Sequence, residues 1–339
     1  MGIIQKTKRK EKKRKEKRRE EKRREEKRRE EKLISPLNNH IYSIAMKYFF
    51  TFLLFTISIY LDGQPLRWKN FRNPSDKLLA DTCIYSISYR YKYYEREDKK
   101  IPYFDHCMLD IGNRISSYYS LYTDQMDSIM YNNRKRGSMG IDPRTELNKK
   151  YKLNSTEKGI YDDYYKNFPN KGELTVSTGI MSTEYIYNEP SPVMNWKITG
   201  GTDSIILGYP CNKADLLFRG RSYVAWFTPQ IPINNGPWKF QGLPGLILKV
   251  TESNGYFEWE ITEIQNTPKK PIYVYAHNGV KHKKCTRLEL LKILRLLWQD
   301  PIAFQISTGM KSHIRKNGEY VPAKPGDKQY PPVPAIELE

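Results

Sequence analysis

The residues that could carry acid–base, nucleophilic or metal chemistry are few beyond residue 63. The histidines there are His106, His277, His282 and His313. Asp105-His106-Cys107 could supply half of a metal site, but a closed zinc site needs three or four ligands. His277 and His282 are five residues apart, which does not match the i,i+4 spacing of one helix face. We therefore predict no metal site and no cofactor.

The sequence also lacks the short motifs that indicate common catalytic sites. No stretch matches GxSxG, HExxH, a P-loop or the dinucleotide-binding GxGxxG. Asp162-Asp163 is a paired carboxylate in a polar region, and a solvated acidic turn explains it more simply than acid–base catalysis. We predict no catalytic residue and expect a binding protein rather than an enzyme. The alternative is a hydrolase with an unfamiliar site that uses His106 or His282.

Four cysteines lie in the same part of the chain. They are Cys83, Cys107, Cys211 and Cys285. An oxidising compartment would permit two disulfides among them, with three possible connectivities. The alternative is that they are small buried apolar side chains. The sequence leaves both interpretations open.

The elements that would position these residues begin late in the chain, because residues 1–45 differ from the rest. The protein has 339 residues and a net charge of +20, and the first 45 residues hold 18 Lys and Arg against eight Asp and Glu. Residues 6–32 contain no apolar side chain, so they cannot form a core-facing stripe. Because Glu residues are interleaved with the Lys and Arg residues and lower the net positive charge, we expect no nucleic-acid binding. The tract is expected to be disordered. Lys, Arg and Glu can all be encoded by codons made only of purines, which suggests a purine-rich stretch translated from upstream of the true start.

Residues 46–63 have the order of a secretory signal peptide. Met46-Lys47 gives a positive start, and an uncharged apolar run of about 14 residues follows from Tyr48. Cleavage after Gly63 would leave a mature chain that begins at Gln64. We expect an exported, periplasmic or secreted protein with no stable membrane span after cleavage. A single-pass anchor is the alternative, although the run is short for one.

Residues 64–339 are expected to form one β-rich domain. The 26 tyrosines favour pleated, half-buried surfaces. Residues 82–91 alternate as a strand does. Tight turns suggest three hairpins, which join 108–111 to 114–119, 193–198 to 204–209 around Gly200-Gly201, and 246–251 to 256–264 around Asn254-Gly255.

Helices are expected mainly near the C-terminus. Thr286 and Glu289 have the spacing of a capping box, and Asp300-Pro301 should end the helix that follows. Residues 121–132 suggest a short helix, and 132–171 a long loop with a helix around 156–167. A Pro-rich tail begins at about Val321. The predicted fold is α+β and mainly β, a curved antiparallel sheet of hairpins with the C-terminal helix packed against it.

The most distinctive stretch is residues 219–250, RGRSYVAWFTPQIPINNGPWKFQGLPGLILKV. It resembles the GLPGLI family of exported proteins from bacteria of the Bacteroides and Flavobacterium type. The name-giving hexapeptide is intact at residues 242–247. Residues 208–214 and the closing Ile336-Glu337-Leu338 also resemble the family. The resemblance brings no established activity and no catalytic residue.

The loop between about Phe227 and Leu246 should be stiff and aromatic. Its prolines fix φ, and its glycines permit conformations closed to other residues. One interpretation is a plug that buries its rings at one end of the sheet. The other is a rigid rim that binds a lipid, a peptide or an outer-membrane partner such as a transport receptor. The candidate binding residues are then Trp226, Trp238, Phe240, Leu243 and Pro244.

Overall fold

The structure is a computed structural model, and it describes Arg23 and residues 77–137, 143–181, 183–275, 282–309, 311–316, 319–327 and 334–338. The chain divides into two units, Met1–Gly63 and Gln64–Glu339, and all of the described residues except Arg23 belong to the second. Apart from Arg23, the predicted charged tract at 1–45 and the predicted signal peptide at 46–63 lie outside the described residues.

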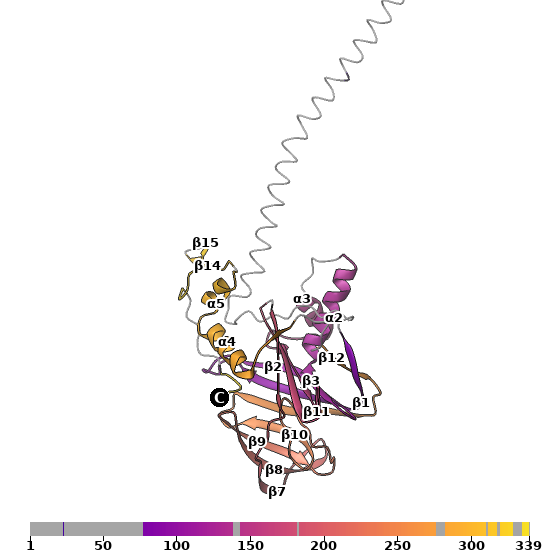
Figure 1. Cartoon of the computed structure of the whole chain (residues 1–339). Coiled ribbons are helices and arrows are strands. Elements are labelled where there is room, and N and C mark those ends of the chain that lie inside the picture. The colour runs from indigo at the N-terminus through magenta and orange to yellow at the C-terminus, as the bar shows by residue number, and fades with distance from the viewer. Residues whose placement is uncertain are drawn as a thin grey trace, which may run out of the picture. The chain divides into compact units, whose positions relative to one another are not determined.

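The fold is mainly β, as the sequence predicts (Figure 1). The strands run in chain order as β1 (Leu78–Tyr94), β2 (Pro102–Gly112), β3 (Ser116–Ser120), β4 (Asp162–Lys166), β5 (Glu173–Ile180), β6 (Thr183–Pro190), β7 (Lys197–Ile206), β8 (Tyr209–Phe218), β9 (Arg221–Thr228), β10 (Leu246–Glu252), β11 (Phe257–Asn266), β12 (Pro271–Val274), β13 (Lys283–Lys284), β14 (His313–Lys316) and β15 (Glu319–Pro322).

Most strands of the described chain belong to one 13-stranded sheet. Its order is β13-β6-β5-β4-β3-β2-β1-β11-β10-β9-β8-β7, and β12 pairs with β1. The pairs are antiparallel except for β13, which runs parallel to β6. The pairing of β1 with β11 joins a run of N-terminal hairpins to a run of C-terminal hairpins. The sheet curves, so side chains from both runs share one core.

The alternation of side chains explains which face of the sheet is buried. Ile87, Tyr89 and Tyr91 of β1 are buried, while Arg90 between them is exposed. An antiparallel sheet can keep one face on the core and the other in water, and successive side chains then alternate between the two. The predicted strand at residues 82–91 is confirmed and lies within the longer β1. The burial alternates only from Ile87 to Tyr91, since Ser86 is also buried and Cys83 packs in a separate cluster beyond a register shift.

Two of the three predicted hairpins are confirmed, and one is wrong. β2 pairs with β3 and β10 with β11, as expected. Gly200-Gly201 does not form a turn but lies inside β7, where the pairing with β8 shifts register repeatedly. The turn is at Leu207-Gly208, with φ values of 47° and 81°. Positive φ at two successive residues is what a type I′ hairpin turn requires, and the glycine pair instead lies among the bulges of β7.

Four helices occur in the described residues: α2 (Leu121–Lys135), α3 (Pro143–Tyr151), α4 (Arg287–Gln299) and α5 (Pro301–Ser307). The capping box of Thr286 and Glu289 is confirmed, and α4 buries Leu290, Leu294 and Leu297 against the core of the sheet. Asp300-Pro301 ends α4 as predicted but also begins α5, because Asp300 caps it and Pro fits the first helical position.

The helix predicted around residues 156–167 is wrong, because that region contains β4. Tyr164 and Tyr165 are adjacent and both buried, on opposite faces of the sheet. Only an extended strand directs neighbouring side chains in this way. β4 also fills the space between β3 and β5, where it bonds to both.

None of the helices in the described part of the chain combines the length and the apolar character needed to cross a membrane. Of the predicted Pro-rich tail, residues 321–327 and 334–338 are described; Val321 and Pro322 belong to β15, and residues 334–338 have no regular secondary structure.

Candidate functional site

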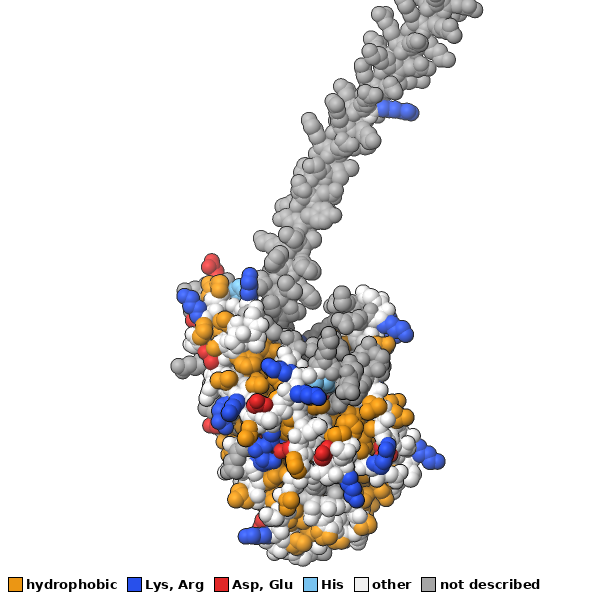
Figure 2. Space-filling model, viewed as in Figure 1, with side chains coloured by type: hydrophobic (Ala, Val, Ile, Leu, Met, Phe, Trp, Pro, Cys, Tyr) orange, Lys and Arg blue, Asp and Glu red, His pale blue; other side chains and the backbone are white. Residues whose placement is uncertain are grey.

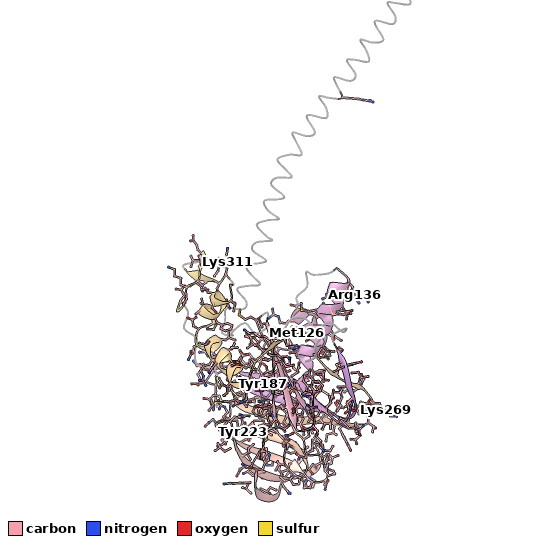
Figure 3. The ribbon with its side chains drawn as sticks, viewed as in Figure 1. Met126, Arg136, Tyr187, Tyr223, Lys269 and Lys311 are labelled. Carbon is pink, nitrogen blue, oxygen red and sulfur yellow. The ribbon has the colours of Figure 1, made fainter. Side chains whose placement is uncertain are left out.

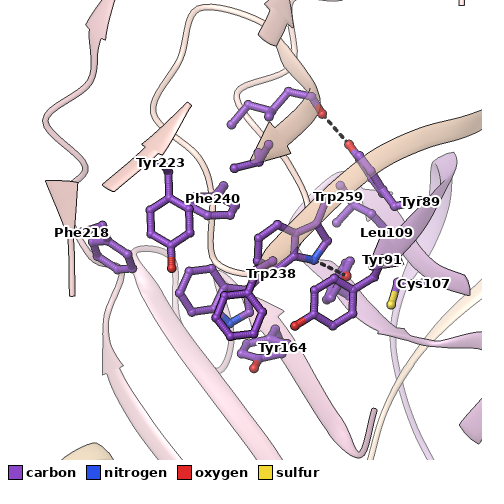
Figure 4. Packing of buried hydrophobic residues seen from close by; sticks show 14 of the residues in the cluster. Tyr89, Tyr91, Cys107, Leu109, Tyr164, Phe218, Tyr223, Trp238, Phe240 and Trp259 are labelled. Carbon is purple, nitrogen blue, oxygen red and sulfur yellow. Dashed lines mark hydrogen bonds between the residues drawn. The ribbon is translucent and has the colours of Figure 1, made fainter. Parts of the chain in front are cut away.

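The loop between β9 and β10 fills the interior of the curved sheet. Trp238 and Phe240 are 2% and 0% exposed, and their ring centroids lie 5.0 Å apart. Trp238 stacks on Trp259 of β11 at 6.0 Å and meets the edges of Tyr164 in β4 and Phe218 in β8 (Figure 4). The loop therefore joins strands from both runs of hairpins into one aromatic core, in which such contacts stabilise beyond the area they bury.

The five predicted binding residues do not share a surface. Trp238, Phe240 and Leu243 are buried, with at most 2% of each exposed, so a ligand could reach them only if the loop moved. Pro244 is exposed, and Trp226 is half-buried in β9. The burial agrees with the plug interpretation for three of the five. Trp226 and Pro244 stay accessible.

Two glycines let the loop pass close to the neighbouring backbone. A Cβ at Gly245, whose φ is +158°, would lie 2.2 Å from the carbonyl oxygen of Thr228. A Cβ at Gly236 would lie 2.8 Å from Cβ of Ile247. The loop backbone then bonds to itself, with Leu246 N–H donating to Ile231 O at 2.9 Å. The last glycine of the hexapeptide is thus required by a contact distance as well as by conformation.

Lys166 of β4 holds the loop through three hydrogen bonds. Its Nζ is buried and donates to Asn235 Oδ1 at 2.8 Å, Gly236 O at 2.8 Å and Phe240 O at 2.7 Å. All three acceptors are neutral. Burial disfavours the charged form, so the pKa of Lys166 is lowered well below the ordinary lysine value. Sequence reasoning missed this residue, although Lys166 occupies the core-facing register of Tyr164.

Lys239 is part of the loop itself, and its amine contacts carboxylates rather than neutral acceptors. Its Nζ lies 3.0 Å from Glu189 Oε1 and 2.5 Å from Glu337 Oε1, and it donates to the hydroxyl of Tyr187 at 2.8 Å. Burial alone would lower the pKa of Lys239, but Tyr187, Glu337 and Glu189 outweigh it and raise that pKa above the ordinary value. Lys239 is therefore an ammonium ion at neutral pH.

Two arginines extend this group of charges. Arg219 lies 3.0 Å from Glu189, and Arg287 of α4 lies 2.9 Å from Glu337 and 3.6 Å from Glu189. We refer to Lys239, Arg219, Arg287, Glu189, Glu337 and Tyr187 as the Lys239 cluster. It links the loop, β6, α4 and the C-terminal segment. Buried charges persist where partners and hydrogen bonds offset their loss of water, as here.

The C-terminal segment 334–338 lies along the Lys239 cluster without regular secondary structure and bends at Ile336. Arg221 Nε donates to Ala335 O at 2.7 Å, and the Tyr223 hydroxyl donates to Ile336 O at 3.2 Å. Leu338 N–H donates to Arg219 O at 2.9 Å. Figure 3 labels Tyr187 and Tyr223 among the side chains of this region. The segment thus makes backbone hydrogen bonds, Ile336 packs against the core, and the buried Glu337 side chain contacts two cations.

The outward face of the sheet carries a row of polar and aromatic side chains. Strand register places them next to one another in the order Lys213 (β8), Trp226 (β9), Lys249 (β10), Glu260 (β11), Arg90 (β1) and His106 (β2). None of the six is buried. Lys249 Nζ lies 2.8 Å from Glu260 Oε2, and the Arg90 guanidinium lies 4.2 Å from the centre of the Phe104 ring. We call these six residues the Trp226 row.

Charge of both signs also marks the face of the molecule shown in Figure 2. Lys and Arg side chains alternate with Asp and Glu, and hydrophobic side chains lie between them. A mixed surface of this kind gives no strong field of one sign. The net positive charge therefore does not by itself identify a ligand.

The predicted half-site Asp105-His106-Cys107 is divided between the two faces. Asp105 and Cys107 are buried, while His106 is exposed. Asp105 accepts from Ser120 Oγ at 2.9 Å and Ile160 N–H at 2.8 Å, and burial raises its pKa to about 7. Among the described residues, no group of three or more His, Cys, Asp or Glu side chains could hold a metal ion. His277 lies outside the described residues.

His282 contacts a serine that the sequence does not single out. Its Nε2 lies 3.2 Å from Oγ of Ser177 in β5. Strand register places Asp163 of β4 opposite Ser177, so the second carboxylate of the Asp162-Asp163 pair is on the same face. Asp163 and Ser177 are 3% and 1% exposed. The expected solvated acidic turn is therefore wrong, since both aspartates belong to a strand inside the sheet.

All four cysteines are free thiols, and three of them are buried. The disulfides considered among Cys83, Cys107, Cys211 and Cys285 are not formed in this structure. Cys107 pairs with Tyr89, six residues along β1 from Cys83. At about 3.3 Å per residue these two positions lie about 20 Å apart, well beyond the reach of a disulfide.

Comparison with known proteins gives two findings. A family model described as a protein of unknown function (Porph_ging) matches residues 217–249, which include β9 and the loop with its hexapeptide. No curated protein matches the chain.

Two solved structures, "Structure of PNGF-II in P21 space group" and the same protein in the C2 space group, share 16% identity with the chain at a TM-score of 0.40. Each match covers 70% of this chain, which spans only 36% and 35% of theirs. Around the loop, the chain is similar to a family whose function is not known.

Proposed function

We propose that this chain is an exported cell-envelope protein of the GLPGLI type that acts by binding a peptide or protein partner of the envelope. The observation that carries the proposal is the Trp226 row on the outward face of the sheet. The aromatic residues of the loop are used to build the core, whereas Trp226 remains accessible between Lys213 and Lys249.

The composition of the row supports a protein partner over a small ligand. Trp and Arg are the residues that most often contribute binding energy at protein interfaces. The row combines them with charges of both signs on a rigid sheet, which would lose little entropy on binding. The family match at residues 217–249 includes Trp226 and Lys249 but indicates no activity.

A photo-crosslinking experiment in cells that make the protein tests this function. Benzoylphenylalanine replaces Val224, which lies two residues from Trp226 on the same face. We expect a discrete crosslinked product that mass spectrometry identifies as a protein. The product should disappear in a Trp226→Ala background and persist with Trp298→Ala, a half-buried tryptophan on α4. No product, a lipid adduct, or a product unaffected by Trp226→Ala would overturn the proposal.

Export rests on the predicted signal peptide and has its own test. Intact mass of the protein from the envelope fraction should correspond to a chain that begins at Gln64. A mass that includes residues 46–63 would indicate an uncleaved anchor instead. A mass that includes residues 1–45 would show that the charged tract is translated.

Ser177 and His282 favour a second candidate function, that of a hydrolase. Their separation of 3.2 Å is within the range of a nucleophile and its general base. The burial of Ser177 argues against it, because a substrate must reach the hydroxyl oxygen. A fluorophosphonate probe should label the protein at Ser177, with labelling lost in Ser177→Ala and kept in Ser222→Ala, an exposed serine of β9. Absence of labelling would remove this candidate.

A further inference from the structure

The C-terminal segment 334–338 occupies a site that has the features of a peptide-binding site. Its contacts are all with residues distant in sequence, from Arg219 to Arg287. The segment has no regular secondary structure of its own. Backbone groups of Ala335, Ile336 and Leu338 are hydrogen-bonded, and the Glu337 side chain is held by two cations. These are the kinds of contact by which proteins hold bound peptides.

Glu337 is the residue that the site recognises. It is 6% exposed, and its two carboxylate oxygens go to different cations, Oε1 to Lys239 at 2.5 Å and Oε2 to Arg287 at 2.9 Å. Leu338 beside it is 47% exposed. Charge-assisted hydrogen bonds to a buried carboxylate are strong and depend on geometry. Affinity should therefore depend on the glutamate far more than on the leucine.

The charges of the Lys239 cluster show that the site requires an anion. Among the charged residues described there, Lys239, Arg219 and Arg287 are cations and Glu189 and Glu337 are carboxylates. Without Glu337, three cations would face Glu189. Lys239 is buried and Arg219 and Arg287 are only partly exposed, so the proximity of these like charges is unfavourable unless a counter-charge enters. The rest of the protein thus forms a preorganised receptor for one more carboxylate.

We propose that the Lys239 cluster with Arg221 and Tyr223 is a binding site for an acidic peptide of the pattern apolar–Glu–apolar. The chain's own residues 334–338 are a tethered occupant, and the site accepts such a peptide in trans when the tether is absent. This inference is independent of the Trp226 row, which lies on the outward face of the sheet.

The test uses the chain shortened to end at Val333 and a labelled synthetic peptide of residues 334–339, PAIELE. A tethered segment competes at a high effective concentration, so we expect the peptide to bind the shortened chain at least about tenfold more tightly than the full chain. A peptide with Glu337→Gln should lose at least about tenfold in affinity. A peptide with Glu339→Gln has the same net charge and should bind more tightly than the Glu337→Gln peptide.

Variants of the protein give a second control. In the shortened chain, Arg287→Gln should weaken peptide binding, whereas Arg295→Gln, an exposed residue on the same helix, should leave it unchanged. Cooperative thermal unfolding confirms that each variant is folded. No binding by a folded shortened chain, or equal binding of the Glu337→Gln and unmodified peptides, would overturn the proposal.

The full chain with Glu337→Gln provides the test if the shortened chain does not fold. Its tether keeps the backbone contacts but loses the carboxylate. The unmodified peptide should bind this variant at least about tenfold more tightly than the unaltered full chain, because its competitor is weakened. Equal affinities would contradict the proposal.

Discussion

Lys166 and Lys239 are two buried lysines that hold the same loop, and they differ in the groups that surround the amine. Lys166 donates to one amide and two backbone carbonyls, whereas Lys239 contacts two carboxylates and a tyrosine hydroxyl. Their pKa values are shifted in opposite directions. The comparison shows that burial alone does not decide whether a lysine is charged, because its partners do.

The two lysines also contribute to the fold in different ways. Lys166 satisfies loop carbonyls that would otherwise be buried without a donor. Lys239 neutralises carboxylates that come from β6 and the C-terminal segment. One lysine thus fixes the path of the loop, and the other attaches distant segments to it. Substitution by methionine, which has a similar shape and no charge, separates these roles.

Lys239→Met should have the largest effect. It leaves Glu189 and Glu337 without the most buried of the cations that contact them, and removing one partner of a buried ion pair costs about 3–5 kcal/mol. Urea denaturation measures the change in the free energy of unfolding. A loss below about 1 kcal/mol would show that Arg219 and Arg287 alone neutralise the cluster.

Lys166→Met should cost less, about 1–3 kcal/mol, because it leaves neutral acceptors rather than charges without a partner. The same urea denaturation gives the comparison under identical conditions. If Lys166→Met destabilised the protein as much as Lys239→Met, the carboxylate partners of Lys239 would not make its loss more costly than the loss of Lys166.

The pH dependence of stability sharpens the comparison. The pKa of Lys166 is lowered on folding from the ordinary value of 10.5, so between the folded and unfolded values the unfolded chain binds more protons. Stability from this group therefore rises with pH up to about 10.5 and is lost as the pH falls, by about 1.4 kcal/mol per pH unit. The difference in stability between the unaltered protein and Lys166→Met should grow from pH 7 to 10. Parallel pH profiles would contradict the lowered pKa.

Breaking the ion pair between Lys249 and Glu260 in the Trp226 row should have the smallest effect on stability. It pairs with Glu260 on the solvated face, where their side chains are 26% and 47% exposed. An exposed ion pair contributes at most about 1 kcal/mol and is screened by salt. Glu260→Gln should therefore change stability by less than about 1 kcal/mol, and less still in 1 M NaCl. A larger loss would mean that this face is less accessible to water than its side chains indicate.

Much of the fold could be predicted from local signals in the sequence. Asn254-Gly255 marks the turn between β10 and β11, and Thr286 with Glu289 marks the start of α4. In both cases residues close in sequence determine the structure. The alternation in β1 similarly identifies its buried face.

The errors arose where distant residues decide the structure. Residues 162–166 are polar and form a strand because β3 and β5 provide bonding partners on both sides. β5 and β6 were not predicted, although their Thr, Val, Ile and Tyr residues favour strands. The aromatic content of this region was evident, but which rings are buried was not. The loop's path through the interior of the sheet buries Trp238, whereas alternation along β9 places Trp226 on the outward face. The buried partners of Lys166 and Lys239 come from segments up to about 100 residues away.

Nitrogen-detected NMR of the lysine side chains tests the central comparison most directly. The Nζ resonances of Lys166 and Lys239, assigned through the two methionine variants, report whether each amine is neutral or charged as the pH changes. We predict that Lys166 loses its proton well below pH 10.5, while Lys239 stays an ammonium ion at that pH. Lys166 that remains charged up to pH 10.5, or Lys239 that loses its proton below it, would contradict the account.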